Sequence, residues 1–388
     1  MRGTDSLSNE NRRNRKQLAQ ILVPNFGARY SGVTSVIRAT LPHLRQELAT
    51  DLIGREAGAR KPDRSTWSAL LKGYVRPEGV PYRIWHARRT IELIVGLALR
   101  SLLRQPLRIV FTSARQRPYT RFTHWLIRQV DRVIVTTPEA GAFVRRPSHL
   151  VPHGIDGDVF RPMADRAAAW AANGLGGQHG IGVFGRVRPQ KGTDLFVEAL
   201  IRLLPRYPTF TAIVVGLTKP GDAAFLAAMK SRVAAAGLAT RVHFLGERPA
   251  DELPGWLASI SICVAPQRHE GFGLVPLEAA ASGTPVVATR VGAAETIIDD
   301  GRTGLLVDPD DLDALTSAIE RLMRDEGLRA HIGAAARAKA LETFAIEREV
   351  AGYFEVYRAL WAEGVHLTRQ IALDNGAGVR HGVVPSGD

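Results

Sequence analysis

Cysteine is nearly missing from this 388-residue sequence, which contains Cys263 alone. A single cysteine excludes any disulfide within the chain and favours a reducing compartment. Because its neighbours in the stretch SICVAP are apolar, we expect a buried thiol without a catalytic role.

Long uncharged apolar segments are missing too. The longest apolar stretch with a helical pattern, residues 90–103, carries Glu92 and Arg100 and is too short to span a bilayer. Residues 1–17 are polar and basic, unlike a signal peptide, and we expect a disordered arm there. The protein is therefore expected in the cytoplasm, with peripheral contact at the cytoplasmic face of the inner membrane as an open possibility.

Several motifs of known sites do not occur in the chain. GxGxxG is missing, which disfavours a dinucleotide site, and the histidines show no zinc spacing such as HExxH. The motif DGD, Asp156 to Asp158, has the form of a metal-binding DxD sequence but lies in a turn-rich linker. We therefore expect no metal and no other cofactor.

Charge is distributed unevenly between the two halves. Residues 1–165 contain 28 Lys and Arg against 13 Asp and Glu, whereas residues 166–388 contain 23 against 25. A basic half attracts polyanions such as nucleic acid, anionic lipid headgroups or an acidic acceptor. A generally arginine-rich composition would give the same surplus. The chain has no nucleic-acid-binding motif and few interleaved aromatic residues, so no nucleic-acid partner is expected.

Short apolar runs alternate with helical patterns along most of the chain. This alternation predicts two α/β domains in series, each a doubly wound, Rossmann-like parallel sheet, that face a central cleft. We divide the chain into a disordered arm (1–17), a first domain with its linker (18–165), a second domain (166–343), a helix that crosses back to the first domain (344–363) and a flexible tail (364–388).

The stretch HEGFGLVPLEAAASG contains two carboxylates, Glu270 and Glu278, on either side of a glycine-rich turn. Pro276 suits the first position of a helix, so EGFGLV is expected to be the turn between a strand and that helix. Its glycines would allow a ligand to approach the backbone, and the amides of Leu274 and Val275 would be available to an anion. A phosphate between two polyhydroxyl groups, as in a nucleotide-sugar, fits this arrangement.

The stretch FGRVRPQKG follows the first strand of the second domain. It places Arg186 and Lys191 on a loop in the same predicted cleft as Glu270. Two fixed cations there can neutralise a diphosphate and stabilise it as a leaving group. A solvated basic turn is the alternative for this stretch.

These motifs, together with GAAETIIDDGRTGLLVDPDD, resemble the donor domain of the family 4 retaining glycosyltransferases, which have the GT-B architecture of two Rossmann-like domains. The stretch PNFGARYSGVTS and the arginine-rich first domain resemble lipopolysaccharide-core mannosyltransferases within that family. This resemblance implies a hexosyltransferase that moves mannose from GDP-mannose to a cell-envelope glycolipid acceptor such as lipopolysaccharide core.

The resemblance also implies roles for individual positions. Arg186, Lys191 and Glu270 are the expected catalytic residues, because they would hold the diphosphate and the donor sugar. Glu278 would bind the ribose, and the remaining donor-binding positions are Gly32, Gly185, Gly271, Phe272, Gly273, Leu274 and Val275.

The first domain departs from the family pattern. The glycine pair of its first loop reads Ser31-Gly32, and the histidine that many members carry near the reacting carbon is replaced by Ser113. We expect His86, Ser113, Arg115 and Gln116 to contact the sugar or the acceptor. Three rival functions stay open: a glycoside hydrolase that uses the two glutamates, a nucleotide-sugar epimerase on the same fold, and a basic nucleic-acid-binding protein.

Overall fold

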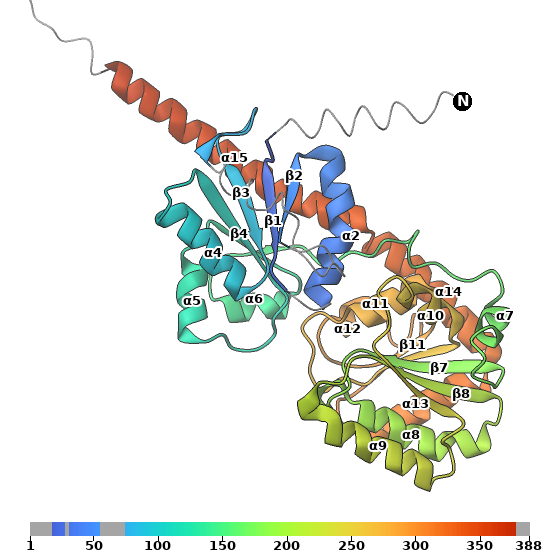
Figure 1. Cartoon of the computed structure of the whole chain (residues 1–388). Helices are drawn as coiled ribbons and strands as arrows, with labels where there is room; N and C mark the ends of the chain where they lie inside the picture. Colours follow the sequence, from blue (N-terminus) through green and yellow to red (C-terminus); the bar gives the residue numbers. More distant parts are fainter. Residues whose placement is uncertain (1–17, 28–30, 55–73, 378–388) are drawn as a thin grey trace, which may run out of the picture.

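The computed structural model describes residues 18–27, 31–54 and 74–377, with side chains as far as Gly364. Two α/β halves follow one another along the chain, and a long C-terminal helix returns from the second half to the first (Figure 1). The predicted disordered arm, residues 1–17, lies outside the described residues. None of the helices in the described part is long and apolar enough to cross a membrane.

The first half is built on a six-stranded sheet in which every pair of neighbours is parallel. Its strand order is β2-β1-β3-β4-β5-β6. The strands are β1 (Ile21–Asn25), β2 (Thr50–Gly54), β3 (Arg83–Ala87), β4 (Leu107–Ser113), β5 (Arg132–Val135) and β6 (His149–Leu150). Parallel strands covered on both faces are apolar throughout, and the burial of β1 and β3 along their whole length fits this rule.

Helices cover both faces of this first sheet. On one face lie α4 (Thr90–Ser101), α5 (Arg121–Arg128) and α6 (Pro138–Val144), and on the other lie α2 (Gly32–Glu47) and the C-terminal helix. Local capping explains where α2, α5 and α6 begin. The side chains of Ser31, Thr120 and Thr137 each accept a hydrogen bond from the backbone amide three residues later.

The second half has its own six-stranded parallel sheet, with the order β12-β11-β10-β7-β8-β9. Its strands are β7 (His179–Phe184), β8 (Phe210–Val215), β9 (Val242–Gly246), β10 (Ile262–Ala265), β11 (Val286–Thr289) and β12 (Leu305–Val307). Cys263 on β10 is fully buried, as predicted, and burial raises the pKa of its thiol.

Two layers of helices enclose the second sheet as well. One face packs against α8 (Thr193–Leu203), α9 (Ala223–Ala235) and α13 (Leu312–Arg324). The other packs against α7 (Arg166–Ala171), α10 (Leu253–Ser259), α11 (Leu274–Ala281), α12 (Ala294–Ile297) and α14 (Glu326–Thr343). Both predicted Rossmann-like units are therefore present.

The chain crosses between the halves twice, and the two crossings touch. The amide of Ile155 donates to the carbonyl of Phe344 at 2.7 Å, and the amide of Ile346 donates to the carbonyl of Ile155 at 3.0 Å. A side chain on Gly154 would lie 2.7 Å from the Cα atom of Ile346, so this close approach requires glycine. The predicted return to the first half is confirmed, since α15 (Ile346–Ala377) packs against α2.

Three local expectations differ from the structure. The helix expected over residues 344–363 continues to Ala377, so residues 364–377 of the expected flexible tail are helical, and residues 378–388 lie outside the described residues. The helix α11 begins at Leu274, two residues before Pro276, because Gly273 adopts a left-handed conformation and serves as its N-cap. No strand is predicted from the sequence over residues 305–307, which form β12. The domain boundaries stay predictions.

Candidate active site

Each sheet has a point at which its strand order reverses, and the loops at such points bind ligands in doubly wound folds. In the second sheet this point lies between β7 and β10, where the loops of residues 185–191 and 266–273 begin. In the first sheet it lies between β1 and β3. The two sequence motifs predicted to carry the chemistry therefore lie on neighbouring loops at the switch point of the second sheet.

Lys191 and Glu270 meet across this switch point. The Lys191 ammonium donates to Oε2 of Glu270, while Oε1 accepts a hydrogen bond from the amide of Gly271 at 2.9 Å. Both side chains are about one-fifth exposed, so the pair remains open to solvent. Gly192 follows with a φ of 65°, and a side chain there would collide with the carbonyl of Pro266. This glycine brings the Lys191 loop against the strand end that leads to Glu270.

The N-terminus of α11 closes the same loop. Leu274 and Val275 are its first two residues, so their amides have no partner within the helix. The positive end of the helix dipole adds to these donors, and together they form a site for an anion. Gly273, with a φ of 91°, is the left-handed residue that turns the chain into the helix.

Glu278 is the fifth residue of α11, two positions further along than in a helix that begins at Pro276. Its side chain is buried, and burial raises the pKa of this carboxyl to about 7. No side chain of the described residues forms an ion pair with it. A buried carboxyl group held without a cation is available to hydrogen-bond a hydroxyl of a ligand.

Arg186 follows β7 directly, after Gly185. Gly185 has a φ of 126° and is exposed, and its amide donates to the carbonyl of Val215 at 2.9 Å. The Arg186 side chain is half-buried and forms no ion pair with the described carboxylates. The loop that carries Lys191 therefore also offers a guanidinium that no described carboxylate neutralises.

Loops of the first half lie against the loop of residues 266–273 and the start of α11. Gly32 lies close to Leu274, since a Cβ atom on Gly32 would be 3.8 Å from Cδ1 of that residue. Gly271 lies closer still to Ala114, because a Cβ atom there would be only 2.5 Å from the Ala114 carbonyl oxygen. The two halves thus contact each other through the loops that were predicted to bind the donor.

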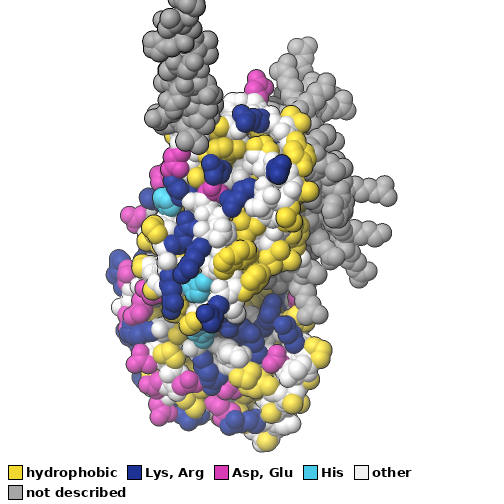
Figure 2. Space-filling view, turned by 90° about the vertical axis from the view of Figure 1, so that its left-hand side faces the viewer, with side chains coloured by type: hydrophobic (Ala, Val, Ile, Leu, Met, Phe, Trp, Pro, Cys, Tyr) yellow, Lys and Arg dark blue, Asp and Glu magenta, His cyan; other side chains and the backbone are white. Residues whose placement is uncertain are grey.

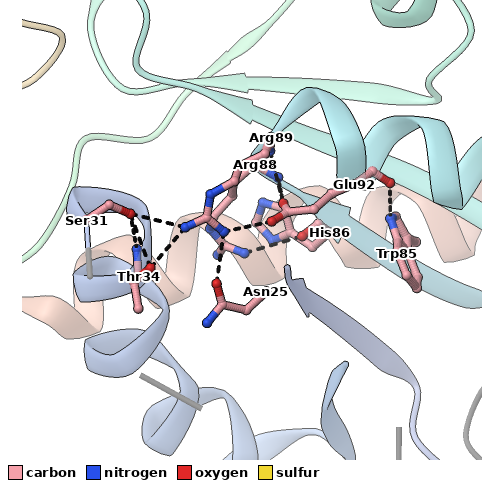
Figure 3. Close-up of polar contacts among 8 residues, drawn as sticks. All are labelled: Asn25, Ser31, Thr34, Trp85, His86, Arg88, Arg89 and Glu92. Carbon is pink, nitrogen blue, oxygen red and sulfur yellow. Dashed lines mark hydrogen bonds and ion pairs between the residues drawn. The ribbon is translucent and has the colours of Figure 1, made fainter. Parts of the chain in front are cut away.

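Arg89 joins the two loops at the switch point of the first sheet (Figure 3). Its Nη1 donates to Oδ1 of Asn25, the last residue of β1, at 2.9 Å and to Oε1 of Glu92 at 2.8 Å. Its Nη2 donates to the hydroxyls of Ser31 at 3.1 Å and Thr34 at 2.9 Å. Sequence reasoning missed this arginine, whose only local signal is the glutamate three residues later at the start of α4.

His86 is not where sequence analysis predicted it. It is fully buried, and its ring nitrogens contact the hydroxyls of Tyr357 at 2.5 Å and Thr112 at 2.6 Å. Burial, with the charge of Arg88 nearby, lowers the pKa of His86 well below its usual range, so the ring is neutral. The structure therefore does not support the role expected of His86 as a sugar or acceptor contact, because Tyr357 of α15 and Thr112 of β4 occupy its two ring nitrogens.

The other expected contacts of the first half lie at the end of β4. The hydroxyl of Ser113 is buried and contacts that of Tyr119 at 2.5 Å. Arg115 donates to the carbonyl of Pro118 at 2.9 Å and lies over the Tyr119 ring. Gln116 donates to Thr137 at 2.9 Å. Arg115 and Gln116 are half-buried beside Ala114, at the cleft, whereas Ser113 is turned into its own half.

Phe272 also differs from its predicted place. Its side chain is buried with its ring 4.9 Å from that of His153, so only its backbone belongs to the open loop. Nδ1 of His153 contacts Glu349 at 2.8 Å, and the same carboxylate accepts from the amide of Gly154 at 2.7 Å and from the hydroxyl of Tyr353. This buried cluster, which we call the hinge clasp, connects the loop of residues 266–273, which we call the donor loop, to α15.

Comparison with known proteins identifies the chain. Residues 178–325 match the family model described as glycosyl transferases group 1. The chain is 43% identical over 342 residues to the lipopolysaccharide core biosynthesis mannosyltransferase LpcC of Rhizobium leguminosarum bv. viciae, covering 88% of this chain and 96% of that protein. The chain is a group 1 glycosyltransferase.

A further relative and a solved structure are similar to the chain as well. The lipopolysaccharide core biosynthesis mannosyltransferase LpsB of Rhizobium meliloti (strain 1021) is also 43% identical, over 88% of this chain and 97% of that protein. The crystal structure of Anabaena Alr3699/HepE in complex with UDP and glucose has a TM-score of 0.71 and 21% identity, covering 88% of this chain and all of that one, which shows the shared fold.

Membership in the group 1 glycosyltransferases confirms the predicted GT-B fold and the predicted class of enzyme. The activity class is glycosyl transfer, which replaces the rival predictions of glycoside hydrolysis and epimerisation. An enzyme of this class needs a nucleotide-sugar donor and a glycolipid or oligosaccharide acceptor.

Proposed function

We propose that this glycosyltransferase moves mannose from GDP-mannose, with retention of the anomeric configuration, to a lipopolysaccharide-core acceptor at the cytoplasmic face of the inner membrane. The mannose and the acceptor are supported by the names of the two relatives at 43% identity, both of which are core biosynthesis mannosyltransferases. The basic first half is suited to a phosphorylated or membrane-borne acceptor.

The proposal rests on one arrangement in the structure: Lys191 pairs with Glu270 in the donor loop, and the N-terminus of α11 follows that loop directly. Arg186 and Lys191, with the amides of Leu274 and Val275, supply positive charge for a diphosphate. Glu270 contacts the donor sugar, on the side of the first half. The buried Glu278 binds the ribose hydroxyls at the other end of the donor.

The ion pair between Lys191 and Glu270 prepares the site for the donor. Before the donor binds, each side chain partly neutralises the other, which reduces the energetic cost of holding both near a cleft. A bound diphosphate competes for the ammonium and leaves a Glu270 oxygen free to accept a hydrogen bond from a sugar hydroxyl. The ion pair between Lys191 and Glu270 is thus replaced by one contact of each side chain with the donor.

Catalysis in this proposal rests on stabilising the departing diphosphate. As the bond between the sugar and the phosphate breaks, negative charge builds on the leaving oxygen, and fixed cations and amides aimed at it lower the barrier. The diphosphate oxygen on the same face of the sugar takes the proton of the acceptor hydroxyl as the new bond forms. Contact between the halves, through Gly271 and Ala114, limits access of water, which would otherwise hydrolyse the donor.

A thermal-shift and turnover experiment tests the proposal. We expect GDP-mannose to raise the melting temperature more than UDP-glucose, UDP-galactose or ADP-glucose do, because a ligand that binds only the native state stabilises it. Lys191→Ala should lower mannosyl transfer by on the order of 100-fold or more, since it removes a charge that acts in the transition state. Lys230, exposed on α9, provides the matched control Lys230→Ala.

Two results would contradict the proposal. A larger thermal shift with a uridine or adenosine diphosphate sugar would overturn GDP-mannose as the donor. Near-native transfer by the folded Lys191→Ala variant would overturn the role of the donor loop in holding the diphosphate.

A further inference from the structure

The outer surface of α4 is apolar, and that of α5 exposes two aromatic side chains between arginines, although helices that cover a sheet are expected to present polar residues to solvent. On α4 and the turn that follows it, the exposed side chains of Ile91, Ile94 and Leu102 recur at helical spacing, and Leu103 lies beside them. Leu102 is 80% exposed. These side chains contribute nothing to the core of the first half, so an exposed apolar stripe of this length calls for a partner.

α5 continues this apolar surface with two aromatic rings. Phe122 and Trp125 are each 55% exposed, and their rings stack against each other with centroids 6.1 Å apart. The two helices pack together on the same face of the first sheet. We call the surface of Ile91, Ile94, Leu102, Leu103, Phe122 and Trp125 the α4–α5 face. Figure 2 views the molecule from the side on which α4 and α5 lie, and shows a band of hydrophobic side chains flanked by Lys and Arg.

Positive charge predominates around this face, although Glu139 of α6 is an exposed acid. Residues 90–150 contain ten arginines and no lysine against three acidic residues. Of those acids, Glu92 is buried and Asp131 is paired with Arg100 and Arg108. Among the described residues, exposed arginines without an ion pair remain at positions 104, 117, 121, 128 and 145. Apolar and aromatic side chains ringed by unpaired cations are the combination that binds an anionic lipid surface.

The α4–α5 face lies next to the loops of the candidate active site. α4 begins just after β3 and α5 begins a few residues after β4, so the first turns of both helices lie at the edge of the sheet that forms the cleft. Ile91 and Phe122 belong to those first turns, and Ala114, which touches Gly271 of the donor loop, precedes α5 on the same connection. A membrane on the α4–α5 face would therefore lie next to the mouth of the active site.

We propose that the α4–α5 face docks on an anionic phospholipid bilayer, with Phe122 and Trp125 inserted among the headgroups and the surrounding arginines on the lipid phosphates. The inference rests on the proposed function, in which the acceptor is membrane-borne, and it names the surface and the side chains that bring the enzyme to that acceptor. The bilayer is favoured over a second copy of the chain because the arginine ring would repel its own copy.

Vesicle sedimentation tests this docking without donor or acceptor, so its outcome is independent of the sugar specificity. The full chain is mixed with vesicles of equal parts phosphatidylglycerol and phosphatidylcholine, or of phosphatidylcholine alone, at low salt. We expect binding to the anionic vesicles only. The double variant Phe122→Ser with Trp125→Ser should lower the ratio of bound to free protein by roughly tenfold or more, and Arg121→Gln with Arg128→Gln should do so by roughly tenfold.

Matched control variants come from exposed residues elsewhere. Val159→Ser with Met163→Ser removes two exposed apolar side chains of the linker, and Arg321→Gln with Arg324→Gln removes two exposed arginines of α13. Both controls should sediment like the wild type. Fluorescence quenching is a second measurement, and it does not depend on a loss of binding. Lipids brominated near the headgroup should quench the emission of Trp125 in the wild type. The Trp125→Phe variant should lack this quenching.

The following results would overturn the proposal. Wild-type protein that stays in the supernatant with anionic vesicles has no such docking face. Equal sedimentation of the wild type and the aromatic double variant would place the contact elsewhere, as would equal quenching of the wild type and Trp125→Phe. A wild-type dimer that the aromatic double variant converts to a monomer would assign the face to a second copy.

Discussion

Glu278 makes the stability of this protein depend on pH in a direction unusual for a carboxylate. Burial in α11 raises its pKa from the ordinary 4.5 to about 7, so the folded protein favours the neutral, protonated form. We predict that Glu278→Gln, which stays neutral at every pH, makes the protein more stable than the wild type in alkaline solution. The advantage should vanish in acid.

The magnitude follows from proton linkage. Below about pH 4.5 the group is protonated in both the folded and the unfolded chain and costs nothing. Between about pH 4.5 and 7 the folded protein retains a proton that the unfolded chain has released, so the free energy of unfolding falls as the pH rises. Above about pH 8 the loss is complete, and since each pKa unit corresponds to roughly 1.4 kcal/mol, it amounts to about 3 kcal/mol.

Urea denaturation of the wild type and of Glu278→Gln at a series of pH values measures this loss. Burying the glutamine amide changes the free energy of unfolding by the same amount at every pH. The quantity to compare is therefore how the difference in unfolding free energy between the two proteins changes with pH. The difference between the variants should grow by about 3 kcal/mol from acid to alkaline solution. Glu342→Gln, an exposed glutamate of α14, is the matched control and should change nothing.

A constant difference between wild type and Glu278→Gln across this range would refute the reasoning, because it would mean that Glu278 has the same pKa in the folded and the unfolded protein. A difference that grows toward acid would refute it more directly, since that sign belongs to a carboxylate stabilised by a cation. The assay must omit nucleotide-sugars, whose hydroxyls would bind the carboxylate.

Two further variants test other parts of the structure. Glu349→Ala leaves the buried donors of the hinge clasp without their acceptor and should lower the free energy of unfolding by about 3 kcal/mol. Glu355→Ala, at an exposed position of the same helix, is the control and should change the free energy of unfolding little. If Glu349→Ala destabilises the protein no more than this control does, the clasp does not contribute to stability. Gly271→Ala places a Cβ atom 2.5 Å from the carbonyl oxygen of Ala114 and should push the halves apart, lowering turnover on the order of 100-fold with the melting temperature nearly unchanged. Gly221→Ala, which meets nothing, is the control, and normal turnover in Gly271→Ala would mean that this contact plays no part in catalysis.

The donor side of the site could be predicted from the sequence because its signals are local. An apolar run followed by glycine and charged residues predicts the end of a strand and the loop after it. Two loops of this kind contain Arg186, Lys191 and Glu270, which were predicted as site residues for that reason. The parallel order of the second sheet then brings these loops together. A left-handed glycine also has a local signature, although the sequence placed the start of α11 two residues late because Pro276 can occupy the third position of a helix as well as the first.

The acceptor side could not be predicted because its contacts join residues far apart in the chain. His86 is buried by Tyr357, 271 positions later, and nothing near His86 indicates which helix will cover β3. The hinge clasp likewise joins His153 to Glu349 over 196 positions. Arg89 has four partners from three separate segments. Without the topology, a histidine at the end of a strand predicts a substrate contact as readily as a core residue.

The two crossings between the halves determine how the enzyme can move. Because the segments at Ile155 and Ile346 are hydrogen-bonded side by side, they behave as a two-stranded strap. Such a strap bends easily across its width but resists twisting, since twisting would break the bonds between the strands. The halves are thus expected to open and close like a book, without swivelling. Each closure would return Gly271 to Ala114 in the same register, so that donor and acceptor meet in one orientation.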